Sequence, residues 1–364
     1  MQYDLAEFAL KMVAPNNKLI YDDKGIPSIM VYVPKFKMSD VIDGAGDSTH
    51  PAFIVNGKEV PGIWISKYQN IVNNGRAYSL PGQDPTVNIT WDTARGYCES
   101  KGKGWHMMTK AEWAAIMLWC KKNGFQPWGN NNYGKDSRET LQQAIPATYG
   151  SDGKINHVLP GTGPLTWSHN KQLDGIWDLN GNVSEWTGAL RTVKGELQLL
   201  ENNNGANSDN PQTATSTAWK AIDATTGAFI TPDGNGTTEN SIKIDAAGTG
   251  GAQWCKTITK TSESFSCLLG SMTCSADISD AAKAVLRAYG LLPVDGAKPA
   301  DYDDDRLYFN NVADERLFYS GGYYYGNGTT AGVGCSGGSW ANRGVVSVSI
   351  GWRSAYVDLE SVGL

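Results

Sequence analysis

Several patterns that mark common classes of protein are missing from this sequence. The 31 lysines and arginines are outnumbered by 37 acidic residues and form no dense cluster, so the chain lacks the basic patch that binds a nucleic-acid backbone. None of the six cysteines belongs to a C-x-x-C pair, which argues against a zinc knuckle. No apolar run approaches the ~20 residues that cross a bilayer. We therefore expect neither a nucleic-acid partner nor a membrane anchor.

The first residues, MQYDLAEFALKMVAPNN, also lack the basic start and long apolar run of a secretory signal peptide. We expect a soluble protein made in a cytoplasm, for which action outside a cell needs another route of release. The cysteine count is even, but a chain of 364 residues is too long for a disulfide-stapled miniprotein. Free buried thiols are the simpler expectation, and the redox compartment stays open.

Two catalytic motifs occur near the carboxyl end without the context that they need. Gly334–Gly338 matches the nucleophile elbow G-x-S-x-G, but a strand pattern follows it, whereas the elbow needs a following helix and a later histidine. All four histidines lie far upstream. Gly332–Gly337 matches G-x-G-x-x-G but opens no helix of a βαβ unit. We interpret both matches as chance products of a glycine-rich stretch.

Metal-ligand spacing is missing as well. The acidic stretch Asp301–Asp305 does not have the spacing of an EF-hand loop, and we interpret it as a solvated turn. The histidines form no H-E-x-x-H pair. We expect no cofactor, while a bound calcium ion is left open.

Helix and strand signals alternate in a way that predicts an α+β fold. Thr90 and Thr109 are placed to cap two helices, the second by a capping box. Asn56-Gly57 predicts a hairpin turn, and IPSIMVYVPKF predicts an earlier strand. Residues 193–305 have low-complexity edges, and we interpret them as an inserted loop-rich subdomain that holds one helix, ISDAAKAVLRAYGLLP.

Five phrases follow one another in a familiar order: TVNITWDTARGYCES, GWHMMTKAEW, QPWG, GIWDLNGNVSEWTG and IGWRSAY. Together they resemble the formylglycine-generating enzyme (sulfatase-modifying factor) family, a branch of the C-type lectin fold. The resemblance implies that fold over residues 25–192 and 306–364, with short antiparallel sheets and two helices. Residues 1–24 lie outside it as an N-terminal helical segment.

Catalytic members of that family have a closely spaced cysteine pair near the carboxyl end, where copper binds. In this sequence Cys335 stands alone there, and Cys267 and Cys274 lie in the predicted insertion. A thiolate copper site needs converging soft ligands, so the resemblance implies a protein that is not an enzyme. An oxidase of the formylglycine-generating type, or a related metal enzyme, is the alternative.

The carboxyl-terminal segment resembles the variable region of diversity-generating retroelement proteins. These display mutable positions on a C-type lectin scaffold, framed by glycine pairs, A-G-V and G-F/W-R. The matching residues here are Gly321-Gly322, Ala331-Gly332-Val333 and Gly351-Trp352-Arg353. The resemblance implies a variable ligand-binding region at about 321–353. It also implies a receptor-binding, tropism-determining protein of a phage or prophage, with a host cell-surface protein or glycan as partner and a homotrimeric arrangement on the virion.

The composition of this segment points the same way. It is almost uncharged and is rich in Tyr, Trp, Ser, Gly and Asn, the mixture that antibody paratopes use. Tyrosine and tryptophan supply contact area with few rotatable bonds, while small polar residues adapt their hydrogen bonds. Trp340 is the expected hot spot, because tryptophan dominates interface energetics.

Strand alternation predicts which of these residues face the ligand. In VVSVSI, we expect Val346, Val348 and Ile350 to face the core and the serines to face out. By the family frame, Tyr324, Arg343 and Arg353 belong to the scaffold. The predicted ligand-binding residues are Tyr323, Tyr325, Asn327, Gly334, Ser336, Gly338, Ser339, Trp340, Ala341, Ser347 and Ser349.

The alternatives to this interpretation remain open at the level of sequence. A glycine-rich β/loop region with inward-packed tyrosines has a similar composition. A structural tail or baseplate protein without a host ligand is a further alternative. Exposure of the aromatic side chains separates the binding interpretation from the inward-packed one, and binding to cells separates it from the structural tail protein.

Overall fold

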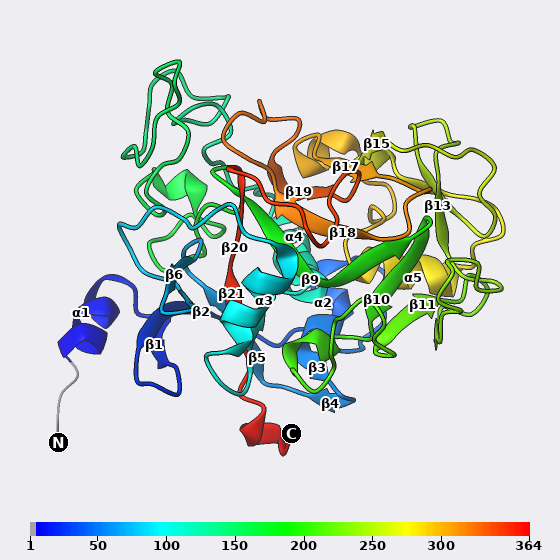
Figure 1. Cartoon of the computed structure of the whole chain (residues 1–364), viewed down its shortest axis with the longest axis horizontal. Coiled ribbons are helices and arrows are strands. Elements are labelled where there is room, and N and C mark those ends of the chain that lie inside the picture. Colours follow the sequence, from blue (N-terminus) through cyan, green and yellow to red (C-terminus); the bar gives the residue numbers. More distant parts are fainter. Residues whose placement is uncertain (1–4) are drawn as a thin grey trace.

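The computed structural model describes residues 5–364, and its smaller sheet joins the two ends of the chain. Five strands lie in the order β1-β2-β5-β21-β8, and each neighbouring pair is antiparallel. Their bounds are Asn17–Tyr21 (β1), Pro27–Pro34 (β2), Gly62–Ser66 (β5), Ser354–Tyr356 (β21) and Trp105–Met107 (β8). Because β21 lies between β5 and β8, the last strand of the chain completes a sheet begun by the first (Figure 1).

The larger sheet has twelve strands and carries the carboxyl-terminal segment. Its main order is β15-β17-β19-β18-β9-β10-β13-β14-β16, with β11 attached at β10, β12 attached at β11 and β20 attached at β9. The bounds are Phe265–Leu268 (β15), Arg306–Phe309 (β17), Gly332–Gly337 (β19), Arg316–Gly321 (β18), Ser184–Val193 (β9), Glu196–Leu200 (β10), Lys243–Asp245 (β13), Gln253–Cys255 (β14), Thr273–Cys274 (β16), Trp219–Ile222 (β11), Phe229–Ile230 (β12) and Ile350–Trp352 (β20).

This sheet differs from the sequence expectation in two ways. The predicted insertion, residues 193–305, is not set apart, because its strands β10 to β16 extend the same sheet as β9 and β18. The sheet is also mixed rather than antiparallel throughout: β20 runs parallel to β9, and β17 runs parallel to β19. Parallel neighbours need long connections, and residues 194–349 separate β9 from β20.

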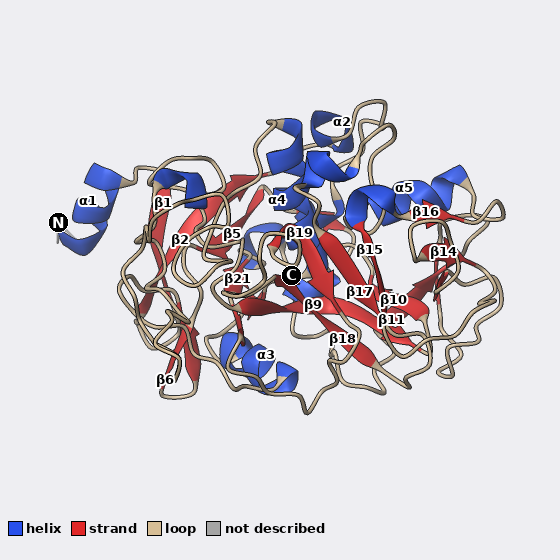
Figure 2. Cartoon of the chain, turned by 90° about the horizontal axis from the view of Figure 1, so that it is seen from above, coloured by secondary structure: helices blue, strands red, loops and turns tan. Residues whose placement is uncertain are grey.

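The helices and small hairpins cover the edges and faces of these sheets. Figure 2 shows α2, α4 and α5 on one side and α3 on the other. The helices are Leu5–Val13 (α1), Met38–Val41 (α2), Trp91–Glu99 (α3), Lys110–Lys122 (α4) and Asp280–Ala288 (α5), and the hairpin strands are Ile54–Val55 (β3), Lys58–Glu59 (β4), Ile71–Asn73 (β6) and Arg76–Tyr78 (β7). Short 3-10 turns occur at Pro51–Phe53, Leu165–Trp167, Asn204–Ala206, Leu269–Ser271, Pro299–Tyr302 and Glu360–Val362.

The capping signals in the sequence are confirmed. The Thr90 hydroxyl accepts the backbone N–H of Thr93, and Thr109 forms a reciprocal capping box with Glu112. The predicted helix near residue 280 begins after Ser279, whose hydroxyl accepts a backbone N–H. Each cap satisfies an orphan donor of the first turn. Local sequence therefore sets where these helices begin.

The N-terminal segment that we expected to be helical contains α1, and its residues 1–4 lie outside the described residues. No side chain of α1 is buried. The core lies elsewhere: the apolar stripe of α4, including Trp113 and Met117, is buried, and α4 packs against β9 and β19. None of the helices described for residues 5–364 combines the length and apolar character that a bilayer-spanning helix needs.

Candidate ligand-binding site

A buried ion pair forms the base under the carboxyl-terminal segment. The Arg353 side chain is fully buried, and its Nε and Nη2 atoms donate to the two carboxylate oxygens of Glu185 at 2.6 Å. It also donates to the carbonyls of Ser66 and Trp177, both at 2.9 Å. A bidentate pair of this kind is geometrically specific. The prediction that Arg353 belongs to the scaffold is confirmed.

Arg343 ties the connection before β20 to the rest of the molecule. Its guanidinium donates to Glu315 at 2.8 Å, to Asp92 at 2.8 Å and to the carbonyl of Gln212 at 2.9 Å. It also lies 5.1 Å from the centre of the Trp91 ring. These contacts reach three separate segments, so Arg343 is a scaffold residue, as the sequence predicted.

A glycine pair turns the chain out of the sheet at the end of β18. The register of β18 against β19 shifts between Ser320 and Gly321, and Gly321 and Gly322 have φ values of 87° and 75°. Residues with side chains rarely adopt this region. A Cβ on Gly322 would also lie 2.2 Å from the Cα of Ala331. The glycines therefore permit the bulge from which three consecutive tyrosines project.

The three tyrosines divide into one buried and two accessible side chains. Tyr324 is buried and packs edge-on against Tyr133, with ring centres 6.1 Å apart, and against His157 at 5.6 Å. Tyr325 is 41% exposed and stacks on Tyr133, and the ring of half-buried Tyr323 lies 4.2 Å from the ring of Tyr325. The predicted scaffold role of Tyr324 is confirmed, and its two neighbours remain available for contact.

A hollow of about 250 Å³, which we call the tyrosine hollow, opens between Tyr323 and Trp340. Trp340 is 46% exposed, and its indole N–H donates to the Tyr319 hydroxyl at 2.8 Å. The walls come from β17, β18, β19, the segments that follow β18 and β19, and the residue before β15. The lining residues are Ser264, Tyr308, Tyr319, Gly322, Tyr323, Thr330, Cys335, Ser336, Gly337, Ser339 and Trp340.

Of the predicted ligand-binding residues, the structure thus brings Tyr323, Ser336, Ser339 and Trp340 together at the tyrosine hollow. Tyr325 and exposed Asn327 lie on the adjoining loop. Ser336 is almost fully buried, yet its side chain belongs to the lining. The aromatic members of the predicted site therefore form one surface, which is the arrangement that the paratope interpretation requires.

Three predicted positions are corrected because they have no room for a variable side chain. A Cβ on Gly334 would lie 2.8 Å from a carboxylate oxygen of Asp305, and one on Gly338 would lie 2.6 Å from the Phe318 ring. Ala341 is fully buried in a cluster with Trp91. The sequence pattern counted these small residues as accessible, whereas close packing is what keeps them small.

The alternation predicted for VVSVSI is wrong. Val346 and Val348 are 50% and 55% exposed, whereas Ser349 is buried and Ser347 is half-buried. Turns interrupt this stretch before β20, so the two-residue period of a strand does not apply. Of the three residues predicted to face the core, Ile350 alone does so.

Several residues that line the site were missed. Tyr308, Tyr319 and Ser264 lie outside the glycine-rich segment on which the sequence prediction concentrated. An aromatic residue two positions before the Gly321-Gly322 pair is the signal that could have identified Tyr319, which is half-buried between buried Phe318 and Ser320. Tyr133 carried no such signal, because its contact with Tyr325 joins distant parts of the chain.

The acidic stretch below the hollow is not a fully solvated turn. Asp303 pairs with Arg138, but Asp305 is buried and accepts the Gly334 N–H at 2.6 Å and the Cys335 thiol at 3.5 Å. Burial raises the pKa of the Asp305 carboxyl and of the Cys335 thiol well above their usual values. The Cys335 thiol, whose ordinary pKa already lies above neutrality, is therefore protonated at neutral pH. Across residues 5–364, no three His, Cys, Asp or Glu side chains gather as metal ligands.

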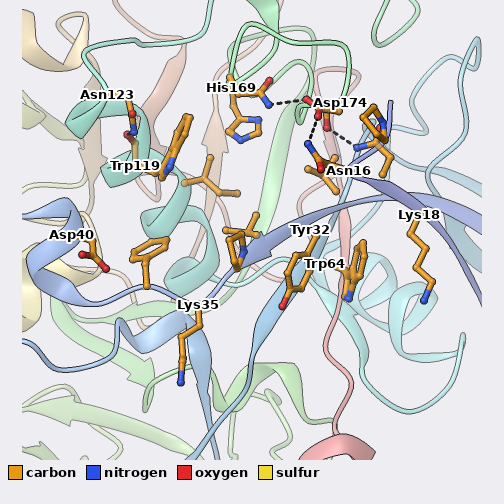
Figure 3. Close-up of a pocket in the computed structure, with 18 of the residues that line it drawn as sticks. Asn16, Lys18, Tyr32, Lys35, Asp40, Trp64, Trp119, Asn123, His169 and Asp174 are labelled. Atoms are coloured by element: carbon orange, nitrogen blue, oxygen red, sulfur yellow. Dashed lines mark hydrogen bonds between the residues drawn. The ribbon is translucent and has the colours of Figure 1, made fainter. Parts of the chain in front are cut away.

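A second, wider concavity of about 1080 Å³ lies beside α1 and is called here the N-terminal groove. Figure 3 shows Trp119, Asn123 and His169 on one side of it and Tyr32 and Trp64 on the other. The Tyr32 and Trp64 rings are 4.7 Å apart. Unlike the tyrosine hollow, this groove includes charged residues of both signs and contains none of the residues predicted from the sequence.

Comparisons with known proteins identify the family of this chain and several similar proteins. The model of the sulfatase-modifying factor enzyme 1-like domain matches residues 24–228. The inactive C-alpha-formylglycine-generating enzyme 2 of Bos taurus is 31% identical over 103 residues, 28% of this chain and 32% of that protein. The formylglycine-generating enzyme of Mus musculus is 29% identical over 127 residues, 34% of this chain and 32% of that protein. The chain thus spans about a third of the length of these relatives.

Two solved structures are similar over most of their length at low identity. PvdO from Pseudomonas aeruginosa has a TM-score of 0.38 and 14% identity, over 93% of this chain and 98% of that one. Treponema denticola variable protein 1 has a TM-score of 0.35 and 12% identity, over 94% of this chain and 100% of that one.

Proposed function

Because the chain belongs to the sulfatase-modifying factor enzyme 1-like family, with its C-type lectin-like α+β fold, we propose that it binds a ligand without catalysing a reaction. The surface made by Tyr323, Tyr325 and Trp340 is the ligand-binding face. The observation that carries the proposal is the gathering of these side chains around one uncharged hollow.

The state of Cys335 supports the non-catalytic part of the proposal. The thiolate is the reactive form of cysteine and the form that binds a soft metal. Burial and the neighbouring Asp305 raise the pKa of Cys335, so the thiol stays protonated and donates to that carboxyl. All six cysteines are free, and five of them are buried. Among the similar proteins, two carry the word inactive in their names.

The surface chemistry supports the binding part. Tyrosine and tryptophan are the residues that most often dominate protein interfaces, and here they rest on a frame fixed by the Arg353–Glu185 pair. A rigid frame lowers the entropy that binding must offset. Charged residues are absent from the lining of the tyrosine hollow, as is usual in the core of an interface.

The finer proposal is a receptor-binding protein of a phage or prophage whose terminal segment is diversified by a retroelement. The glycine pair, A-G-V and G-W-R phrases support it, because each sits at a scaffold position around the accessible tyrosines. The DNA tests it directly. We expect a near-copy of the 3′ coding end that differs at adenines, beside a reverse-transcriptase gene. A locus that has neither the near-copy nor the reverse-transcriptase gene would contradict the proposal.

The proposal includes assembly of several copies through α1, which would raise avidity when single contacts are weak. Leu5, Phe8 and Met12 on this helix are 76%, 61% and 72% exposed. An apolar helix face of this kind is usually covered by a partner. Sedimentation measurements on the chain and on a Phe8→Asp/Met12→Asp variant test this: we expect a trimer that the variant loses.

The central experiment compares two surfaces of the same protein. A Tyr323→Ala/Tyr325→Ala/Trp340→Ala variant removes the proposed face, and a Tyr32→Ala/Trp64→Ala variant removes the aromatic pair of the N-terminal groove. We expect the first to abolish binding to host cells and the second to leave it unchanged. Equal binding by all three proteins would reject the proposed face.

The rival enzyme is tested separately. Copper titration with measurement of oxygen uptake on a cysteine-containing peptide is expected to show no turnover. Turnover that disappears in a Cys335→Ala variant would favour an oxidase of the formylglycine-generating type.

A further inference from the structure

The tyrosine hollow has a more specific chemistry than a general contact surface. Its lining contains hydroxyl groups and aromatic rings but no carboxylate, ammonium or guanidinium group. We propose that it holds one neutral, hydroxyl-rich ring, a monosaccharide unit of a cell-surface glycan. This inference rests on the proposed ligand-binding face and names the class of ligand that the face accepts.

The aromatic walls provide flat surfaces for the apolar side of a sugar ring. The Tyr319 and Trp340 rings lie 6.1 Å apart at 58° and are joined by the indole hydrogen bond. A Cβ on Gly337 would lie 2.6 Å from the Tyr319 ring, so the glycine allows this ring to lie close against β19. Such rings have an apolar body and a polar tip, which matches a ring with C–H faces and an edge of hydroxyls.

The hydroxyl groups of the lining have free hydrogen-bonding capacity. Within residues 5–364, the side-chain hydroxyls of Ser264, Tyr308 and Ser339 make no hydrogen bond. Tyr319 accepts the Trp340 N–H and so keeps its own O–H to donate. Each hydroxyl can both donate and accept, which suits a ligand whose own groups do the same.

Charged ligands are disfavoured by the same lining. The nearest basic group on β17, Arg306, donates to Ser266, and Asp305 lies buried below Gly334. Burial raises the pKa of Tyr308 to about 12, so its hydroxyl stays neutral. A charged group entering the hollow would lose hydration without gaining an ionic partner, which is costly.

Size limits the ligand further. The hollow of about 250 Å³ is smaller than the ~300–1,000 Å³ typical of pockets for whole small molecules. It accommodates one ring, and the rest of a glycan would extend over exposed Tyr325.

The hollow also combines fixed and variable positions. Ser264, Tyr308 and Tyr319 lie before the predicted variable region, whereas Tyr323, Ser339 and Trp340 lie within it. Diversification would therefore keep the preference for a neutral ring and change which epimer or linkage is chosen. This division identifies Tyr308 as a specificity-determining residue that no retroelement would alter.

The test uses the whole chain with methyl glycosides of mannose, galactose and glucose and with N-acetylglucosamine, followed by saturation-transfer NMR and titration. At least one neutral sugar is expected to bind, while sialic acid and glucosamine do not. Tyr308→Phe removes one hydroxyl and keeps the ring, so we expect about tenfold weaker binding. The matched control is Tyr356→Phe, which changes another half-buried tyrosine on the other sheet and should leave affinity unchanged.

Cell binding separates this inference from the function on which it rests. Binding lost after periodate treatment of the cells supports a sugar. If none of the neutral sugars gives saturation transfer, and cell binding survives periodate but not protease, the hollow takes a protein side chain and the inference is overturned while the proposed function stands. If cells bind the face-deleted triple variant as well as the original chain, the proposed function itself fails.

Discussion

The carboxyl-terminal segment contains two regions that differ in burial and in hydrogen bonding. Around Arg353, charged groups are buried, Arg353 is paired with Glu185, and the Arg353 side chain contacts β5, β9 and the loop at Trp177. Around Tyr323 and Trp340, uncharged side chains are accessible and share few hydrogen bonds with the rest of the protein. The difference shows that the buried, hydrogen-bonded side chains around Arg353 hold the segment in place, whereas the accessible side chains around Tyr323 and Trp340 are available for binding.

The largest expected effect on stability comes from removing the buried ion pair around Arg353. Arg353→Ala leaves Glu185 buried without its partner, and removing one member of a buried pair lowers the free energy of unfolding by about 3–5 kcal/mol. Urea unfolding measures this. Lys35→Ala, which removes an exposed pair with Glu59, should cost at most about 1 kcal/mol; equal effects would remove the distinction between the buried frame and the surface.

The same region should show a characteristic pH dependence. Asp178 is buried, and desolvation raises its pKa to about 7. The native state then binds more protons than the unfolded state between the unfolded pKa of about 4 and about 7, so stability falls as pH rises through this window. Asp178→Asn should remove up to about 4 kcal/mol of that fall. Unfolding free energies at pH 4 and pH 8 test it, and parallel profiles would contradict the raised pKa.

Glycine substitutions locate the boundary between the two regions. Gly338→Val must displace the Phe318 ring, and overpacking of this kind costs about 1–3 kcal/mol. Gly344→Val is the control, because a Cβ there meets its nearest atom at 3.6 Å, and we expect a change within about 0.5 kcal/mol. Thermal unfolding compares the two. If Gly338→Val leaves the stability unchanged, Gly338 again becomes a candidate for the variable ligand-binding residues.

Substitutions around Tyr323 and Trp340 should change binding affinity and leave the free energy of unfolding nearly unchanged. Trp340→Ala is expected to weaken binding to host cells by about 2 kcal/mol, the range of interface hot spots, with little change in unfolding. Val346→Ala, at a similarly exposed side chain, is the control that should bind normally. A large loss of stability in the Trp340→Ala variant would show that Trp340 is a scaffold residue and not a ligand-binding one.

The smallest effect is expected at Val348. Because this side chain is 55% exposed, Val348→Ser should change the unfolding free energy by at most about 0.5 kcal/mol. A loss of 1 kcal/mol or more, about that of buried apolar groups, would restore the core position that strand alternation first predicted.

Much of the fold could be predicted because the relevant signals are local. Thr109 with Glu112 and Ser279 mark helix starts through bonds within one turn, and Asn56-Gly57 marks a hairpin through its backbone preference. The role of Arg353 could be predicted from an ordered family phrase. These features depend on neighbours in the chain, so the sequence contains them directly.

The site could be predicted only in part. Tyr323, Tyr325 and Trp340 were found because aromatic residues in an uncharged segment are conspicuous. Gly338 and Val348 were misjudged because their accessibility depends on Phe318 packing and on turns that replace a strand.

By itself, the sequence determined the helix caps, the glycine bulge and the set of side chains available for binding, since these follow from local stereochemistry and composition. Only the tertiary structure decided that Tyr308, Tyr319 and Trp340 enclose one hollow, and that residues 193–305 extend its sheet. Contacts between distant segments form when many weak local preferences are satisfied at once, and no short stretch of sequence records that outcome.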